Sequence, residues 1–303
     1  MSTRPLRLRR CQLSVPGSSE KMMAKAAASN VDYVFLDLED AVAPSVKVPS
    51  RKNIIRALKE LDWGKKTRCV RINDLTTEWA YEDIIEIVEE AGELVDIIMI
   101  PKIMSGKDIY WVDTLLTQME KKLGLRKRIG IEVLIEEVEA MINVEEIVLS
   151  SPRLEAIIFG MGDYSASQGV DVTAIGGDTD YPGDIWHYAR NKIVIAARMG
   201  GVDAIDGPFA NFKDAEGYRR EAQRAETLGF TGKWAIHPAQ IDIAQDVYSP
   251  SQAQVDNARR MAKAYREAEE QGLGAVALDG NLIDAASIRI MKNVMAKADM
   301  IGM

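Results

Sequence analysis

Acidic side chains recur directly after short apolar runs of the sequence, where a strand would end. One run leads into Asp37, Glu39 and Asp40, a later run carries Glu132, and another is followed by Asp163. Carboxylates held close together raise one another's pKa, and a divalent cation removes that cost. Because the available ligands are oxygens rather than His or Cys, the pattern favours Mg²⁺ or Mn²⁺ over Zn²⁺. Glu132 and Asp163 are the expected metal ligands.

Each of these assignments has a plainer alternative. Asp163 could instead cap the helix that follows it. Arg71 lies among the acids at another strand end and could bind substrate or serve as an ion-pair partner for residues 37–40. For the acids of that segment, a supporting role through salt bridges or metal-held water is expected rather than direct catalysis. His187 and His237 have no Ser or Cys partner suggested by the sequence, so a hydrolase triad is not expected.

The apolar runs alternate with amphipathic segments along most of the chain. The expected strands are Gln12–Val15, Tyr33–Leu38, Cys69–Ile72, Ile97–Pro101, Ile129–Val133, Ala156–Phe159, Ala204–Asp206 and Trp234–Ile236. The expected helices between and after them are Ser19–Ala28, Ser50–Leu61, Glu78–Ala91, Ile109–Lys122, Glu136–Val148, Asp184–Met199, Ala215–Thr227 and Gln240–Val247. Eight strand–helix units predict a (β/α)8 TIM barrel, whose chemistry gathers at the C-terminal strand ends. An open doubly wound sheet is the rival, but no Gly-rich phosphate loop follows the first strand.

The chain continues beyond the eighth unit, which divides it into a barrel domain at 1–248 and a C-terminal helical extension at 249–303. Ser249-Pro250 is typical of a helix start, and a polar helix is expected over Ser251–Gln271. Gly272–Ala275 reads as a flexible joint, and a last helix begins near Leu282. Such an extension could be a lid, an oligomer arm, or a helix that simply caps the barrel.

Composition excludes several classes of protein. The 303 residues are 47% hydrophobic and 28% charged, which is typical of a globular chain with a sizeable core. The net charge of −8 argues against a nucleic-acid or anionic-membrane partner, and no apolar run is long enough for a membrane span. Cys11 and Cys69 are the two cysteines and form no zinc or disulfide pattern, so a cytoplasmic protein is expected.

Several motifs, in order along the chain, carry a family resemblance. They are Arg10–Leu13 with Val15–Ser18, Phe35–Pro44, Val70–Asn73, Ile98–Lys102, Phe159–Tyr164, Trp186–Tyr188, Ile205–Phe209, Gly232–Pro238 and Leu282–Asp284. With these motifs the chain resembles the malyl-CoA lyase branch of the citrate lyase β-like (HpcH/HpaI aldolase) family, within the phosphoenolpyruvate/pyruvate-binding barrels.

The resemblance implies a division of roles among the strand-end residues. Glu132 and Asp163 would hold Mg²⁺, and Arg71 would bind the keto acid and the developing enolate oxygen. Asp284 would be the acid/base, carried on a lid that closes over a neighbouring subunit's site. Gly162 would let its backbone approach the keto acid.

The resemblance also implies the ligands and the assembly. Coenzyme A would run along the barrel mouth past Lys25, Ile236 and Pro238, although Ser14 and Ser19 depart from residues that some members carry. The implied activity is a carbon–carbon (oxo-acid) lyase that reversibly cleaves L-malyl-CoA, and β-methylmalyl-CoA, to a CoA thioester and glyoxylate. The implied assembly is a homo-oligomer, a trimer or hexamer.

Other activities remain open at this point. They are an (S)-citramalyl-CoA lyase, a citryl-thioester lyase and a malyl-CoA thioesterase. A non-catalytic scaffold barrel is not expected, because a scaffold has no need for Arg71, Glu132, Asp163 and Asp284 together.

Overall fold

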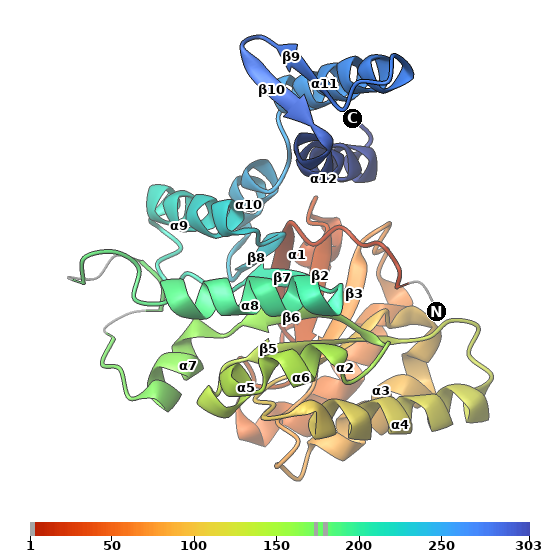
Figure 1. Ribbon diagram of the computed structural model, residues 1–303. Coiled ribbons are helices and arrows are strands. Elements are labelled where there is room, and N and C mark those ends of the chain that lie inside the picture. Colours follow the sequence, from red (N-terminus) through yellow and green to blue (C-terminus); the bar gives the residue numbers. More distant parts are fainter. Residues whose placement is uncertain (1–3, 173–174, 178–180) are drawn as a thin grey trace. The chain divides into compact units, whose positions relative to one another are not determined.

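Eight parallel strands close into a barrel in the computed structural model, which describes residues 4–172, 175–177 and 181–303 (Figure 1). The strands are β1 (Cys11–Pro16), β2 (Tyr33–Asp37), β3 (Thr67–Arg71), β4 (Ile97–Ile100), β5 (Gly130–Ile135), β6 (Leu154–Phe159), β7 (Asp203–Asp206) and β8 (Gly232–Ala235). Each pairs in parallel with the next, and β1 pairs with β8 to close the ring. The predicted (β/α)8 barrel is therefore confirmed.

The strands are buried on both faces, which explains their continuous apolar sequences. Alternate residues of each strand point into the barrel, where they form one packed cluster. Its members are Tyr33, Phe35, Cys69, Ile97, Met99, Leu134, Ala156, Ile158, Ile205 and Trp234. In barrels of this kind the polar side chains that act on a ligand gather at the C-terminal strand ends.

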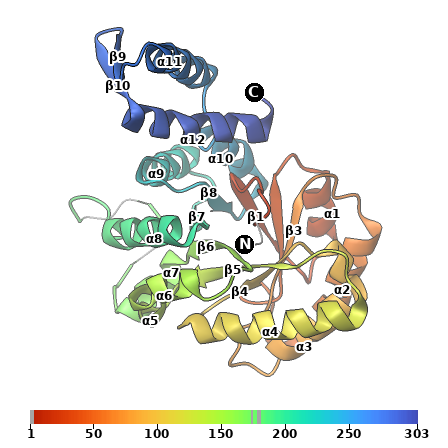
Figure 2. The same cartoon turned by 45° about the vertical axis from the view of Figure 1, so that its right-hand side comes forward.

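Helices surround the strands, as the turned view shows (Figure 2). They are α1 (Glu20–Ala28), α2 (Lys47–Glu60), α3 (Ala80–Ala91), α4 (Gly106–Leu123), α5 (Val138–Ile142), α6 (Val144–Leu149), α7 (Met161–Gln168), α8 (His187–Gly200), α9 (Ala215–Leu228) and α10 (Ile241–Val247). Within the described residues, no helix combines the length and apolar character needed to cross a membrane.

Several helix predictions need correction; α4 starts three residues before the predicted Ile109, and α8 starts three residues after the predicted Asp184. The expected helix at Glu136–Val148 starts only at Val138 and is broken at Asn143, because β5 runs two residues further than predicted. The second helix starts at Lys47 rather than at Ser50, since Pro49 fits inside a first helical turn where no backbone N–H is needed. Helix α7, directly after β6, was not predicted at all.

The chain divides into two compact units, one ending at Gln245 and the other spanning Asp246–Met303. The second unit holds α11 (Gln252–Glu270), a hairpin of β9 (Ala275–Leu278) and β10 (Asn281–Asp284), and α12 (Ala285–Ile301). The predicted joint at residues 272–275 is instead the entry to this hairpin. Ser251, not Ser249, caps α11, through a capping box with Gln254.

Candidate active site at the strand ends

Arg71 and Asp37 are the last residues of two paired strands, β3 and β2, and face each other there. The Arg71 Nε–Asp37 Oδ1 distance is 2.7 Å and the Nη2–Oδ2 distance is 2.6 Å, a bidentate pair. Nη1 lies 3.0 Å from Glu39 Oε2. Arg71 therefore forms ion pairs with acids of residues 37–40, as the alternative interpretation predicted. A guanidinium carries five N–H groups, so donors remain for a substrate oxygen.

Glu132 does not lie where the sequence suggested. It is the third residue of β5 and is fully buried inside the barrel, not at the strand end. Its Oε1 accepts a 2.7 Å hydrogen bond from Arg9 Nε, and its Oε2 accepts one of 3.0 Å from Gln12. Both oxygens are therefore occupied by protein donors, and the prediction of Glu132 as a strand-end metal ligand is wrong in its placement. The error follows from ending the strand at Val133.

Glu136 is the carboxylate that stands at the end of β5. It is 2% exposed, and its Oε1 accepts a 2.7 Å hydrogen bond from the Lys102 backbone N–H. Burial, and then the nearby charge of Asp163, raise the pKa of Glu136 to about 8. A Cβ on Gly160 would lie 2.5 Å from Glu136 Oε2, so glycine at that position makes room for the carboxylate. The apolar run Val133–Ile135 directly before Glu136 was the signal that could have found it.

Asp163 is the third residue of α7, which begins directly after β6. Gly160 is the N-cap of that helix and has no side-chain cap bond, so Asp163 is not a capping residue. Its side chain is 44% exposed, and Oδ1 lies 3.8 Å from Lys102 Nζ. At Gly162, a Cβ would lie 3.0 Å from Ile175 Cδ1, so the glycine keeps a tight place open beside Asp163.

Lys102, which follows β4, was not predicted as a site residue. Its ammonium group forms a short hydrogen bond with Glu39 and lies 3.3 Å from Asp40 Oδ1. Lys102 also adopts a positive φ of 48°, which side-chain-bearing residues seldom do. The sequence shows only a polar residue after Pro101, and nothing in that pattern reveals the backbone conformation or the contacts.

A buried lysine of α2 fixes the acidic segment after β2. Lys47 Nζ donates to the carbonyl oxygens of Leu38 and Glu39, both at 2.8 Å, and to Asn73 Oδ1 at 2.6 Å. Because Asn73 follows β3, this one ammonium group ties two neighbouring strand ends together. Glu39 and Arg71 are thereby held in a fixed arrangement.

The oxygen donors at this end of the barrel fit a hard divalent cation. Glu136 and Asp163 are close enough for the charge of one to raise the pKa of the other. No cluster of three or more His, Cys, Asp or Glu side chains suited to a metal occurs among the residues that the structure describes. Two carboxylates are, however, the usual protein contribution to a Mg²⁺ site, where water and substrate oxygens complete the coordination.

The residues expected to line a coenzyme A site lie apart from this cluster in the fold. Lys25 is exposed on α1, and Ile236 is 39% exposed directly after β8. Pro238 opens a short 3-10 turn, and the preceding His237 ring stacks on Phe212 with centroids 4.7 Å apart. Ile236 and Pro238 directly follow β8, whereas Lys25 lies in the last turn of α1, and no contact in the structure tests the role of these residues.

Asp284 belongs to the second unit of the chain. It is the last residue of β10 and caps α12, with Oδ1 accepting hydrogen bonds from Ser287 N at 2.9 Å and Ser287 Oγ at 3.0 Å. These hydrogen bonds hold the pKa of Asp284 below its usual range, so its carboxylate is ionised at neutral pH.

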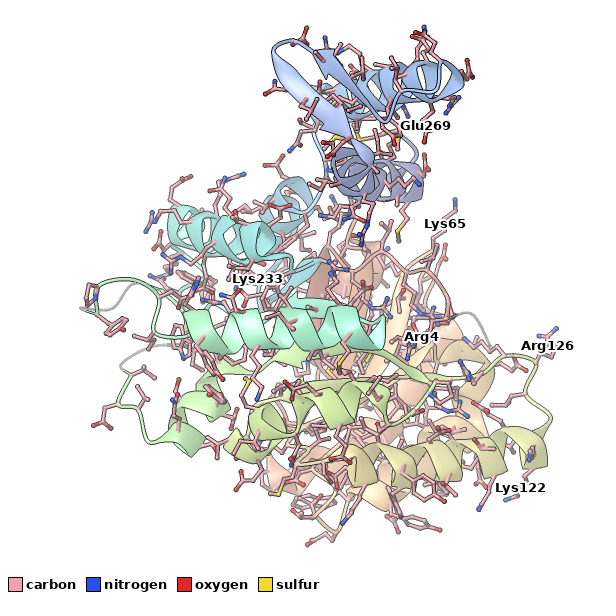
Figure 3. The ribbon with its side chains drawn as sticks, viewed as in Figure 1. Arg4, Lys65, Lys122, Arg126, Lys233 and Glu269 are labelled. Atoms are coloured by element: carbon pink, nitrogen blue, oxygen red, sulfur yellow. The ribbon has the colours of Figure 1, made fainter. Side chains whose placement is uncertain are left out.

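Buried ion pairs surround the charged residue at the end of β7. Asp206 is fully buried and binds Arg190 Nε at 2.9 Å and Lys233 Nζ at 2.5 Å. Lys233 also reaches Glu221 of α9 at 2.7 Å, and Figure 3 labels it at this wall of the barrel. Every group in this cluster has an opposite charge beside it, so the cluster holds α8 and α9 against β7 and β8.

Known proteins share both the sequence and this architecture. The chain is 44% identical over 306 residues to the L-malyl-CoA/β-methylmalyl-CoA lyase of Rhodobacter capsulatus, covering 98% of this chain and 96% of that protein. It is 34% identical to the malyl-CoA/β-methylmalyl-CoA/citramalyl-CoA lyase of Chloroflexus aurantiacus, covering 98% and 90%. Protein CitE of Mycobacterium tuberculosis, solved with magnesium and pyruvate, superposes with a TM-score of 0.64 at 26% identity, covering 81% and 92%.

A family model described as HpcH/HpaI aldolase/citrate lyase matches residues 10–238. The matched stretch starts just before β1 and ends just after β8, so it spans every strand end of the cluster described above. With this match and the 44% identity across nearly its whole length, the chain belongs to the HpcH/HpaI aldolase/citrate lyase family.

Proposed function

We propose that the protein is a Mg²⁺-dependent carbon–carbon lyase that reversibly cleaves L-malyl-CoA to acetyl-CoA and glyoxylate. β-Methylmalyl-CoA, which yields propionyl-CoA and glyoxylate, is its second substrate. The observation that carries the proposal is the convergence of Arg71, Glu136 and Asp163 at the ends of β3, β5 and β6. The lyase names of the relatives support the substrate class.

Glu136 and Asp163 would hold the metal ion, with Mn²⁺ as a possible substitute for Mg²⁺. When bound, the ion supplies Lewis-acid polarisation of the keto-acid oxygens. Glu136 replaces Glu132 in this assignment, because only Glu136 presents its carboxylate at the strand end.

The remaining steps fall to the chain's own residues. In the condensation direction, Asp284 takes a proton from the acetyl methyl group and an enolate forms. The free N–H groups of Arg71 donate hydrogen bonds to the enolate oxygen. The enolate carbon then attacks the aldehyde carbon of glyoxylate, and the resulting alkoxide oxygen takes up one proton, which balances the proton that Asp284 removed. Cleavage is the reverse of these steps.

The proposal extends to the assembly. Asp284 lies in the C-terminal unit, which we assign as a lid whose Asp284 serves the site of a neighbouring subunit in a homo-oligomer, a trimer or hexamer. Closure would exclude water and protect the enolate. Lys25, Ile236 and Pro238 are the assigned contacts of coenzyme A. Both cysteines are free and buried, which supports a cytoplasmic location.

Product analysis by mass spectrometry tests the activity. Purified protein is mixed with glyoxylate, Mg²⁺ and acetyl-CoA or propionyl-CoA, alongside a sample containing a chelator. We expect malyl-CoA and β-methylmalyl-CoA only where the metal is present. Free malate with free coenzyme A would instead identify a thioesterase. No product with either thioester would contradict the proposal, and pyruvate in place of glyoxylate would then test citramalyl-CoA.

Asp284→Asn tests the acid/base assignment. Asparagine caps a helix about as well as aspartate, so the variant removes the proton acceptor and keeps the start of α12. Turnover should fall at least about a hundredfold, in line with the usual contribution of a general base, while Mn²⁺ affinity stays unchanged. Ser251→Ala, which weakens the cap of α11 in the same unit, is the matched control and should keep normal turnover. Wild-type rates for Asp284→Asn would contradict the assignment.

A further inference from the structure

Lys102 combines a strained backbone with contacts to three strand ends. Its φ of 48° lies in the left-handed region, and among the described residues only Asp279 shares a positive φ without being glycine. Such a conformation is unfavourable for a residue with a side chain and persists where the surrounding structure requires it. Here the conformation aims the backbone N–H at Glu136, at 2.7 Å, while the side chain extends in another direction.

The ammonium group of Lys102 meets the acids of two other strand ends. It binds Glu39 and Asp40 after β2, and lies 3.8 Å from Asp163 in α7 after β6. Burial alone would lower the pKa of Lys102, but the hydrogen bond and charge of Glu39, with the charges of Glu136 and Asp163, raise it overall. Lys102 therefore stays protonated across the physiological range.

The negative and positive groups around Lys102 can be counted. Five carboxyl groups interact here: Asp37, Glu39, Asp40, Glu136 and Asp163. Against them stand Arg71, Lys102 and the buried Lys47, whose neighbours include the first three of these acids. When a bound cation keeps all five carboxyl groups ionised, including Glu136, the acids exceed the bases by two charges, which equals the charge of one divalent cation. Without Lys102 the excess would be three.

We propose that Lys102 is a positioning residue that sets the charge balance of the site, so that the site takes both a divalent cation and an anionic keto acid. This inference rests on the proposed function, because the keto acid is the anion that the balance serves. The ammonium group weakens cation binding and favours binding of the acid's carboxylate. The backbone N–H, independently, orients Glu136.

Removal of the Lys102 charge should change the affinities for the divalent cation and for glyoxylate in opposite directions. Like charges repel, so removal of the ammonium group should tighten the binding of a divalent cation. In a wet site, one unit charge acting on a nearby divalent ion is worth about a tenfold change in affinity. The same removal leaves a more negative site and should weaken the binding of glyoxylate by a similar factor.

Lys102→Met is the test, because methionine keeps an unbranched stem and removes the charge. We expect the Kd for Mn²⁺, measured by electron paramagnetic resonance, to fall about tenfold. The KM for glyoxylate should rise about tenfold, with a smaller change in kcat. Lys107→Met, at an exposed lysine in the first turn of α4, is the matched control and should change neither value.

A merely structural role gives a different result. If Lys102 only held the carboxylates in place, its loss would weaken Mn²⁺ and glyoxylate together, and that outcome would overturn the proposal. Unchanged values for both ligands would also overturn it. Lys102→Arg, which keeps the charge, should restore the Mn²⁺ affinity to within about threefold of the wild-type value.

Lys102→Gly keeps the test decisive if the methionine variant fails to fold. Glycine adopts the positive φ without strain and retains the backbone N–H to Glu136, so the backbone conformation at this position favours folding of the variant. It should show the same opposite changes in the two affinities.

The two proposals fail separately. Mn²⁺ binding is measured without turnover. If the wild type forms no malyl-CoA but Lys102→Met binds Mn²⁺ more tightly than the wild type, the proposed function is contradicted and the charge-balance role is retained. If the wild type forms malyl-CoA but Lys102→Met binds Mn²⁺ with unchanged affinity, the proposed function is retained and the charge-balance role is contradicted. No Mn²⁺ binding by the wild type would contradict both.

Discussion

The two ends of the barrel both hold buried charges, but only one end is closed. At the N-terminal end, Arg9 uses all three guanidinium nitrogens, on Glu132 at 2.7 Å, Glu155 at 2.6 Å and Asp203 at 3.0 Å. The side chains of Arg9 and Glu132 are 2% and 0% exposed. Further out, Arg4, labelled in Figure 3, donates to the Gly200 and Gly201 carbonyl oxygens. This end is sealed by protein donors and acceptors.

At the C-terminal end, the acids outnumber the bases and two of them reach solvent. The side chains of Asp40 and Asp163 are 56% and 44% exposed, and that of Lys102 is 22% exposed. Buried charges that are fully matched by protein partners have a structural role, because removal of one partner leaves the other charge uncompensated. An unmatched and accessible excess of one sign instead favours a ligand of the other sign. Glu132 and Glu136, four residues apart, belong to these two different ends.

Glu136→Gln should have the largest effect on function. Glutamine keeps the shape and the acceptor for the Lys102 N–H but removes the negative charge that holds the cation. Because Lewis-acid stabilisation is worth several kcal/mol, turnover should fall about a thousandfold. Steady-state rates of malyl-CoA cleavage measure this. A variant within tenfold of the wild type would remove Glu136 from the site.

The pH dependence of stability should also separate the two glutamates. The pKa of Glu136 is about 8 in the folded chain and 4.5 is its ordinary value. Between pH 4.5 and 8 the folded state therefore holds the proton on Glu136, whereas the unfolded state has lost it. The stability that this carboxyl group contributes is fully present below pH 4.5 and is lost as the pH rises towards 8. The loss is up to about 1.4 kcal/mol per pH unit.

Urea unfolding at several pH values, with a chelator present, measures this loss. The difference in unfolding free energy between wild type and Glu136→Gln should change with pH in the direction given above. Saturating Mg²⁺ should flatten that change, because a cation stabilises the ionised carboxylate. An equal pH dependence for the two proteins would contradict the assigned environment of Glu136.

Glu132→Gln should have the smaller effect, and on stability alone. Arg9 keeps Glu155 and Asp203 as partners, so losing one charge-assisted hydrogen bond should cost about 2 kcal/mol. Turnover should stay within about twofold of the wild type, because this carboxylate is sealed inside the barrel. Chemical denaturation and steady-state rates on the same sample measure both. A large loss of turnover in a stably folded variant would return Glu132 to the site.

Much of the fold could be predicted from the apolar runs, because parallel strands buried on both faces give continuous apolar segments that are easy to recognise in a sequence. All eight strands lie where they were expected, and the Asp37, Arg71 and Asp163 strand ends follow from them. The Glu132 prediction failed for a local reason. Apolar runs do not fix where a strand stops, and the two extra residues of β5 make Glu136 the carboxylate at the strand end.

Other features depend on geometry that a single sequence does not carry. The left-handed conformation of Lys102 is imposed by its surroundings, since lysine has no local preference for it. The hairpin of β9 and β10 turns at Asp279-Gly280, two residues with positive φ, yet the short strands around it have no clear alternation. The glycines within residues 272–275 therefore predicted only a flexible joint, and the hairpin itself was not predicted.

Mn²⁺ titration of Glu132→Gln and Glu136→Gln side by side tests the central claim most directly. Electron paramagnetic resonance counts free Mn²⁺ and does not require turnover. The two-end comparison predicts wild-type affinity for Glu132→Gln and a loss of at least about a hundredfold for Glu136→Gln, since Mg²⁺-type sites have few protein ligands. Lost binding in Glu132→Gln with normal binding in Glu136→Gln would contradict it.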